Sequence, residues 1–236
     1  MDRVKIIKTK LFAVEILRLF KEEYPYERLS SFLNLPIPVL SRYVNGKVLP
    51  SLKRAKEIIK LFKETYLKDL ILRKISWDET GAMDHTPILF DINLLDKIAK
   101  VGVQEFIDKR IDKILTLETD GIPLAVLMGK ELGVDVVITK YRKEMGVKEF
   151  IDVKQIRETG MYTYVFVPKN SIKRGENILL VDDFLRDVYN VDCMVEICKV
   201  AKANVVGMFV MFAIGKKALN YMKKSRFPIK ALMTFS

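Results

Sequence analysis

The chain has 236 residues and half of them are apolar, which suits one large domain or two small ones with buried cores. No run of about 18 apolar residues occurs, so the sequence predicts no membrane-spanning helix. The start, MDRVKIIKTKLF, lacks the apolar core and cleavage site of a signal peptide, and we expect a cytoplasmic protein. The net charge of +11 is uneven: residues 1–76 hold 17 Lys and Arg against 8 Asp and Glu, and residues 77–236 hold the other 24 against 22.

This charge distribution indicates a polyanion-binding module joined to a near-neutral body. The alternative is that the lysines only solubilise the surfaces of the helices and bind no partner. Net charge is an argument about partners and not about the fold. With one histidine and no CxxC pair, we expect no structural zinc site and assign no metal ligands. Cys193 and Cys198 are interpreted as reduced core residues. His85, in a turn-rich stretch, is interpreted as a solvent or turn residue.

Apolar residues at helical spacing predict a helix over residues 11–23, a short helix over 27–33 and a second short helix over about 38–44. The sequence Asn-Leu-Pro at 34–36 breaks the two short helices apart, and Asn-Gly at 45–46 is a natural left-handed stop. Two short helices joined by a tight break, after one longer helix, are the layout of a helix-turn-helix.

The stretch LSSFLNLPIPVLSRYVNGKVLPS resembles the helix-turn-helix of small repressor-type DNA-binding domains, over roughly residues 10–60. The resemblance implies that the second short helix enters a major groove of double-stranded DNA and that flanking basic groups meet phosphates. The candidates for contact with bases or backbone are Ser41, Arg42, Tyr43, Asn45 and Lys47. Tyr43 could instead pack in the core, and Arg42 could pair with Glu27.

Residues 51–75 predict one strong helix with Ser51 as its N-cap. Its broad apolar stripe needs a partner, which the second domain or a second protomer would supply. The next stretch, 76–87, is rich in turn and polar residues. We therefore place the boundary there, with a small all-α DNA-binding domain and connecting helix in residues 1–76 and a second domain in residues 77–236.

From residue 88 onward, strand-like and helix-like runs alternate, which predicts an α/β domain with a buried parallel sheet. The expected strands are 111–117, 134–139, 162–167, 178–181 and 204–213, and the expected helices are 94–109, 122–132, 191–202 and 216–223. Residues 147–167 are polar and alternating, with Glu158 and Thr159 near the middle, and predict an antiparallel excursion or flap. Its basic residues Lys148, Lys154 and Arg157 could close on a ligand or be solvated.

Two motifs in residues 80–236 resemble the phosphate-binding parts of type I phosphoribosyltransferases. LETDGIPLAVLMGKELGV is similar to the loop and helix that hold pyrophosphate, and VVITKYRK is similar to the next strand, whose basic end faces phosphates. The ligand-binding residues that these motifs imply are Glu118, Thr119, Asp120, Gly121, Lys140, Arg142 and Lys143.

A third motif, ILLVDDFLRD, resembles the ribose-phosphate motif of the same family. There Asp182 and Asp183 would bind the ribose hydroxyls, because ionised carboxylates only accept hydrogen bonds. The family follows these acids with a Thr-Gly-rich stretch, since a phosphate is held by backbone N–H groups that only small residues let approach closely. Arg186 is the one residue of this loop that could supply a cation to a ligand.

Four residues of this loop depart from the family's pattern. The small and hydroxyl-bearing positions are occupied by Asp187, Val188, Tyr189 and Asn190. Asp187 places a negative charge where a phosphate would rest, and two like charges ~4 Å apart repel by a few kcal/mol at an effective dielectric near 20. We expect a spoiled 5-phosphate site and no catalysis, whereas ligand sensing is retained.

The fusion resembles microbial transcription regulators that use a phosphoribosyltransferase-like domain to sense intermediates of nucleotide metabolism. It implies a homodimer that binds DNA and takes a phosphorylated or ribose-containing effector. The alternative is an active phosphoribosyltransferase acting on a nucleobase or orotate, in which Mg²⁺ would bridge the diphosphate. A third alternative keeps the second domain as a dimerisation scaffold without a ligand.

Overall fold

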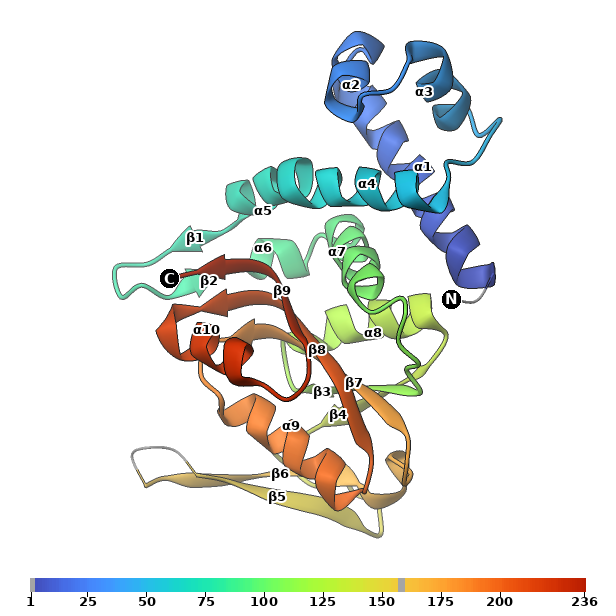
Figure 1. Cartoon of the computed structure of the whole chain (residues 1–236). Helices are drawn as coiled ribbons and strands as arrows, with labels where there is room; N and C mark the ends of the chain where they lie inside the picture. The colour runs from blue at the N-terminus through green and yellow to red at the C-terminus, as the bar shows by residue number, and fades with distance from the viewer. Residues whose placement is uncertain (1–2, 157–159) are drawn as a thin grey trace. The chain divides into compact units, whose positions relative to one another are not determined.

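In the computed structural model of the chain, residues 3–156 and 160–236 are described. The chain divides into two compact units, Met1–Ile75 and Ser76–Ser236 (Figure 1). No helix among the described residues is both long and apolar enough to cross a membrane. Arg157, Glu158 and Thr159, named above in the flap, lie outside the described residues.

Helices make up the described part of the first unit. In chain order they are α1 (Arg3–Glu23), α2 (Tyr26–Leu33), α3 (Ile37–Val44), α4 (Leu52–Phe62), the π-helical turn η1 (Lys63–Leu67) and α5 (Lys68–Lys74). The helix expected over 11–23 thus begins earlier, at Arg3. The helix expected over 51–75 is interrupted by η1, which places the Tyr66 ring against Phe62 and its hydroxyl on Glu23.

Helices α2 and α3 are joined by a tight break, as the Asn-Leu-Pro sequence predicts. Asn34 ends α2 in the left-handed conformation, with φ of 48°, and Pro36 is the N-cap of α3. The Ser30 hydroxyl donates to the Leu35 carbonyl at 2.6 Å, which closes the break. The predicted N-cap of α4 is confirmed, because the Ser51 hydroxyl accepts from the Arg54 N–H at 3.2 Å.

An aromatic cluster forms part of the core of the first unit. Phe62 of α4 packs edge-on against Phe12 of α1 with ring centroids 6.5 Å apart, and its ring is tilted against that of Phe20 at 6.0 Å. Tyr66 adds an edge-on contact to Phe20 at 5.9 Å. Aromatic pairs in such geometry contribute about 0.5–1.5 kcal/mol each beyond their buried area, so the cluster holds α1 against α4.

The second unit is built on a five-stranded sheet in the order β4-β3-β7-β8-β9. All neighbours in it are parallel. Its strands are β3 (Lys113–Leu117), β4 (Asp135–Thr139), β7 (Asn177–Leu185), β8 (Asn204–Ile214) and β9 (Ile229–Phe235). The expected α/β class with a buried parallel sheet is therefore confirmed.

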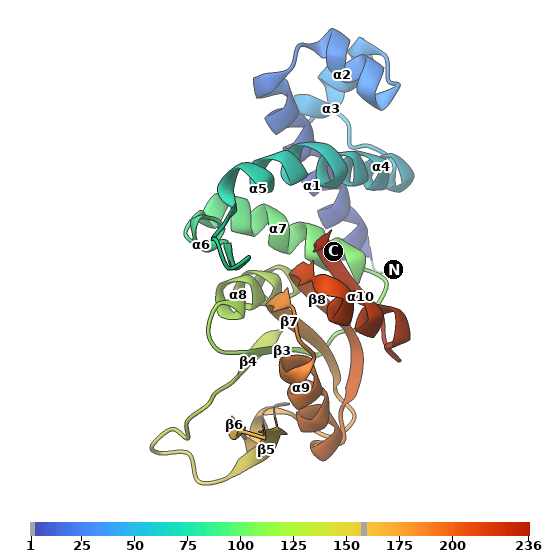
Figure 2. The ribbon, with the colours of Figure 1, turned by 90° about the vertical axis from the view of Figure 1, so that its left-hand side faces the viewer.

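Helices cover both faces of this sheet (Figures 1 and 2). Helices α7 (Ile92–Glu105) and α8 (Gly121–Leu132) lie on one face. Helices α9 (Tyr189–Val200) and α10 (Gly215–Lys224) lie on the other, where their apolar side chains share a core with β3, β7 and β8. Cys193 and Cys198 of α9 are buried free thiols, as expected, and burial raises the pKa of Cys198 to about 12.

Short elements complete the second unit. They are the antiparallel pair β1 (Ser76–Trp77) and β2 (Met83–Asp84), helix α6 (Thr86–Leu89), the antiparallel hairpin β5 (Phe150–Ile156) and β6 (Tyr162–Pro168), and the 3-10 turn η2 (Lys169–Ser171). The hairpin agrees with the expected excursion. The pair β1–β2, α6 and β9 were not expected, and β7 runs to Leu185 where a strand ending at 181 was expected.

Candidate functional site

The loop after β3 lies at the carboxyl edge of the sheet, where open α/β sheets bind ligands. Glu118 begins this loop with a cis peptide bond to Thr119. Its carboxylate accepts from the Tyr141 N–H at 2.6 Å, and its own N–H donates to the Thr139 carbonyl at 3.0 Å. Glu118 therefore fastens the loop after β3 to the loop after β4, while Thr119 is exposed.

Gly121, the first residue of α8, lies directly against β7. A Cβ at this position would lie 2.6 Å from the Asp182 carboxylate oxygen Oδ1 and 2.9 Å from the Thr116 hydroxyl. Real Cβ atoms do not come so close to other atoms. Only glycine therefore lets the loop of residues 118–121 approach the strand that carries Asp182 and Asp183.

Asp182 is buried, with 4 % of its surface exposed. Its Oδ1 accepts from the Asp183 N–H at 3.0 Å, and its Oδ2 is buried without a hydrogen-bond partner among the described residues. Burial, and then the neighbouring charge of Asp183, raise the pKa of Asp182 well above its usual range. Burial therefore favours the protonated form of Asp182 more than it would for an exposed aspartic acid.

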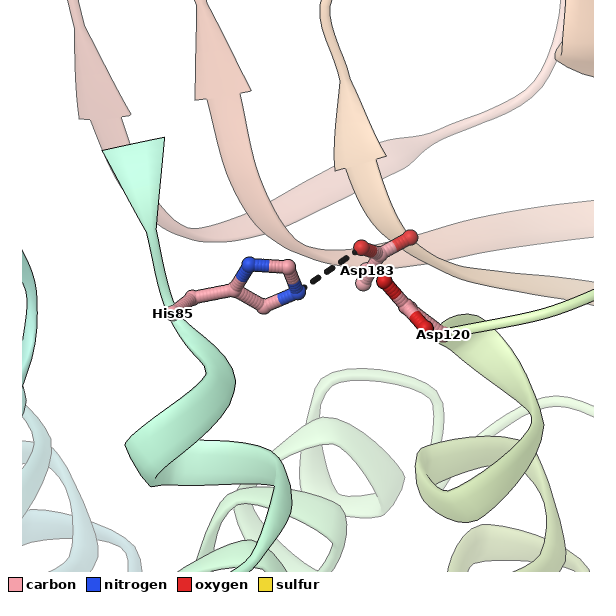
Figure 3. A group of neighbouring side chains, drawn as sticks. All are labelled: His85, Asp120 and Asp183. Atoms are coloured by element: carbon pink, nitrogen blue, oxygen red, sulfur yellow. Dashed lines mark ion pairs between the residues drawn. The ribbon is translucent and has the colours of Figure 1, made fainter. Parts of the chain in front are cut away.

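Asp183 has a different environment, because its carboxylate pairs with His85. The Asp183 Oδ2 and His85 Nε2 atoms are 2.9 Å apart (Figure 3). Burial acts to raise the pKa of Asp183, but the contacts with His85 and Asp182 outweigh it, and the pKa is lowered. The interpretation of His85 as a solvent or turn residue is wrong: it is 7 % exposed and belongs to the site.

Asp120 completes a group of three side chains in which His85 and Asp183 face it (Figure 3). Their ligand atoms lie within 4.8 Å of one another, which is compatible with holding a metal ion. The two carboxylates suit Mg²⁺, which prefers oxygen ligands, whereas the imidazole suits a softer cation. Asp120 and Asp183 thus offer Mg²⁺ the oxygen ligands that it prefers, whereas the nitrogen of His85 does not suit it.

The basic residues after β4 gather around the β5–β6 hairpin. Lys140 forms an ion pair with Glu144. Lys140 and Arg142 line a cavity of about 250 Å³ together with Phe150 of the hairpin. The Lys143 ammonium lies 5.6 Å from the Phe150 ring centroid. A ligand that spans Asp183 and Lys140 would have to compete with Glu144 for the ammonium.

The loop between β7 and α9 is short, because β7 continues past the acids to Leu185. The Asp187 carboxylate accepts from the N–H of Tyr189, the first residue of α9, at 3.1 Å. The chain therefore supplies its own anion to the N-terminus of this helix, which is a natural phosphate position. The Arg186 guanidinium lies 5.3 Å from the Phe184 ring centroid, and Val188 and Asn190 are half-buried.

In the first unit, the candidate DNA-binding residues lie at the carboxyl end of α3 and just after it. Arg42, Asn45 and Lys47 are exposed, whereas Ser41 and Tyr43 are half-buried. The Asn45 amide donates to the Ser41 carbonyl at 2.8 Å, so it also closes the helix. The residues therefore share one end of α3, with three side chains open to solvent.

No model of a protein family matches the chain. Among solved structures, the adenine phosphoribosyltransferase of Thermoanaerobacter pseudethanolicus is similar to it, with a TM-score of 0.63 and 18 % identity over 72 % of this chain and 99 % of that one. The fold of the second unit is thus that of the type I phosphoribosyltransferases.

Curated relatives fall into two groups. The purine biosynthesis transcriptional repressor PurR of Bacillus subtilis is 28 % identical over 127 residues, which are 53 % of this chain and 45 % of the repressor. The xanthine phosphoribosyltransferase of Leuconostoc mesenteroides is 32 % identical over 51 % of this chain and 65 % of the enzyme. That of Clostridioides difficile is 30 % identical over 54 % of this chain and 69 % of the enzyme. The chain belongs to the phosphoribosyltransferase family and spans about half to two thirds of the length of these relatives.

Proposed function

We propose that the protein is a cytoplasmic, homodimeric transcription regulator that binds double-stranded DNA through its first unit and a ribose-containing effector through its second. The observation that carries the proposal is the fusion: a basic helical unit with the α2–α3 pair precedes a phosphoribosyltransferase fold. The similarity to the PurR repressor of Bacillus subtilis supports it.

Helix α3 would lie in the major groove, as the second helix of a helix-turn-helix does. Arg42 and Lys47 are exposed and cationic, so they suit phosphates or guanine edges. Ser41, Tyr43 and Asn45 would contact bases or backbone beside them. Two copies in a dimer would read two half-sites about one helical turn apart.

The effector would bind at the carboxyl edge of the sheet, against Asp183 and the loop of residues 118–121. Asp182 would shape this pocket from beneath the loop, since its carboxyl is buried. Lys140, Arg142, Lys143 and Arg186 would supply cations to an anionic part of the effector. A Mg²⁺ that accompanies a diphosphate group would be held by Asp120 and Asp183 and would offset the negative charge of that group.

Effector binding would change DNA affinity only if the effector has different affinities for two arrangements of the protein. A spoiled 5-phosphate site would favour sensing over catalysis. A transferase needs both ends of its phosphorylated donor held in geometry, because positioning supplies much of the rate. Asp187, whose carboxylate accepts from the Tyr189 N–H at the start of α9, would remove one of these holds.

Selection of genomic DNA fragments by the purified full-length protein tests the proposal. It should be done at near-physiological salt, because low salt favours nonspecific charge binding. We expect a shared, roughly palindromic site. Substitution of the exposed Arg42 by Ala should abolish selective recovery, whereas substitution of the exposed Lys130 on α8 should not. Recovery of random fragments that are released together as salt rises would contradict the proposal.

The second candidate function is an active phosphoribosyltransferase, which the relation to xanthine phosphoribosyltransferases favours. A base nitrogen would attack the ribose carbon C1 of phosphoribosyl diphosphate, and diphosphate would leave. We expect no turnover with adenine, guanine, hypoxanthine, xanthine, uracil or orotate. Diphosphate release with any of these bases, lost in Asp183→Asn, would establish the enzyme in place of the sensor.

A further inference from the structure

The carboxylate assigned to the effector's ribose already has a partner within the chain. Asp183 Oδ2 lies 2.9 Å from His85 Nε2, and both side chains are largely buried, with 13 % and 9 % of their surfaces exposed. A pair in such surroundings is screened little by water or salt. A ligand hydroxyl that donates to Asp183 on this side must therefore compete with the imidazole.

Two aromatic rings pack against the imidazole. The His85 ring meets the Phe184 ring edge-on, with centroids 4.5 Å apart, and the Phe212 ring at 6.1 Å. Phe184 and Phe212 are opposite each other in the β7–β8 pair, with centroids 5.4 Å apart. The sheet itself thus builds a socket for His85 next to Asp183.

We infer that His85 is an intramolecular competitor of the effector, which binds through a vicinal diol on Asp183 and displaces the imidazole from that carboxylate. The inference rests on the proposed function in taking Asp183 as the ribose-binding acid. It adds the regulation of that site: the free protein keeps the carboxylate closed, and ligand binding must release His85.

The position of His85 in the chain connects this release to the junction of the two units. His85 directly follows β2, whose Asp84 pairs with Ser76, the first residue of the second unit. The loop between β1 and β2 is cross-linked by Asp78, which accepts from the N–H groups of Thr80 and Ala82 at 2.9 and 2.8 Å. A displacement of His85 would therefore act on a short, hydrogen-bonded segment that is joined through residue 75 to α5 of the first unit.

Two substitutions separate competition from other roles of His85. Phe in place of His85 fills the aromatic socket but cannot pair with Asp183, whereas His85→Gln keeps an N–H donor. The probes are adenosine, guanosine, inosine, xanthosine and their 5′-monophosphates, and calorimetry on the full-length protein measures their affinities. We expect H85F to bind at least one probe roughly tenfold more tightly than the unsubstituted protein, because no imidazole competes for Asp183, and H85Q to stay close to it.

Equal or weaker binding by H85F would overturn the inference, because His85 would then be structural or would itself hold the ligand. The absence of binding by every probe to both proteins would also overturn it. Circular dichroism of H85F and H85Q checks that both variants are folded.

The second readout is the effect of the bound probe on affinity for the selected DNA site. We expect this effect in the unsubstituted protein and in H85Q, and its loss in H85F despite tighter probe binding. A full effect in H85F would overturn the link to the junction. A protein that selects no DNA site would contradict the proposed function alone, since the affinity ratio between H85F and the unsubstituted protein still decides on the competition.

Discussion

At the scale of single residues, the acid pair shows that neighbours in sequence can have opposite protonation behaviour. The raised pKa of Asp182 means that the folded protein keeps a proton that the unfolded chain releases above the ordinary pKa of 3.8. Its contribution to the free energy of unfolding is therefore fully present below about pH 4 and is lost as pH rises toward the folded-state pKa, by at most about 1.4 kcal/mol per pH unit.

Asp182→Asn removes this titration while keeping the shape of the side chain. We expect the free energy of unfolding of D182N, relative to the unsubstituted protein, to rise with pH between about pH 4 and neutrality. Urea unfolding followed by the fluorescence of Trp77, the single tryptophan, measures this in the second unit, where Trp77 packs against Phe235. Because the two carboxyls titrate as a pair, the comparison reports on the pair. A difference that is flat with pH would show that Asp182 is ionised when folded.

Asp187 provides the second prediction at this scale. Asp187→Thr removes the carboxylate at the N-terminus of α9 and keeps an oxygen that can cap the helix. We expect affinity for ribose 5-phosphate to rise roughly tenfold, since a like charge no longer faces the phosphate. Isothermal calorimetry measures it, with Asp152→Asn as a control that removes an exposed carboxylate from the hairpin. An equal gain in the control would assign the effect to net charge alone.

The site could be predicted from sequence where it depends on consecutive residues. Acids that follow an apolar run are expected at the carboxyl edge of a parallel sheet, and Asp183 lies there. His85 could not be found in this way, because its partner is distant in sequence and its flanking residues are typical of a turn. The one available signal was that the single histidine of the chain lies near the start of a family-like domain. The different environments of Asp182 and Asp183 depend on packing against Gly121, which no local pattern encodes.

At the scale of elements, the break between α2 and α3 depends on one residue with positive φ. Asn34 tolerates φ of 48°, whereas a Cβ without a polar group costs about 1–2 kcal/mol in the left-handed region. We expect Asn34→Ala to lower the free energy of unfolding by about 1 kcal/mol. Asn34→Gly should leave the free energy of unfolding almost unchanged. Hydrogen exchange of the Leu35 amide, which donates to the Ser30 carbonyl at 3.1 Å, reports on this break. Equal loss of hydrogen-exchange protection in both variants would mean that the Asn34 side chain, and not its positive φ, stabilises the turn between α2 and α3.

Elements with strong periodicity were predicted to within a few residues, and those set by tertiary contacts were not. Helices α8 and α9 and strands β3 and β4 carry continuous apolar patterns that decide their identity. Strand β9 is largely half-exposed and follows a lysine-rich helix, so its pattern is weak, and it is held as a strand by pairing with β8. Strand β7 extends past the acids because Phe184 and Leu185 pair with β8, which sequence alone does not show.

At the scale of the whole molecule, the uneven charge predicts where nucleic acid binds. The logarithm of the DNA-binding constant falls linearly with the logarithm of the salt concentration. Each phosphate contact that is lost makes this negative slope shallower by about 0.9. Arg42→Ala with Lys47→Ala removes two exposed cations of the first unit, and Lys223→Ala with Lys224→Ala removes two from α10 of the second. The two double variants therefore have the same net charge.

For the selected DNA site, we expect the first double variant to bind more weakly and to have a salt slope shallower by about two. The second double variant should leave the affinity and the slope nearly unchanged. Fluorescence anisotropy across a series of salt concentrations measures the slopes. A similar loss in both variants would mean that the field of the whole protein, rather than contacts at α3, attracts DNA. A loss confined to the α10 variant would assign the polyanion-binding surface to the second unit. The cations of the first unit would then have no role in DNA binding.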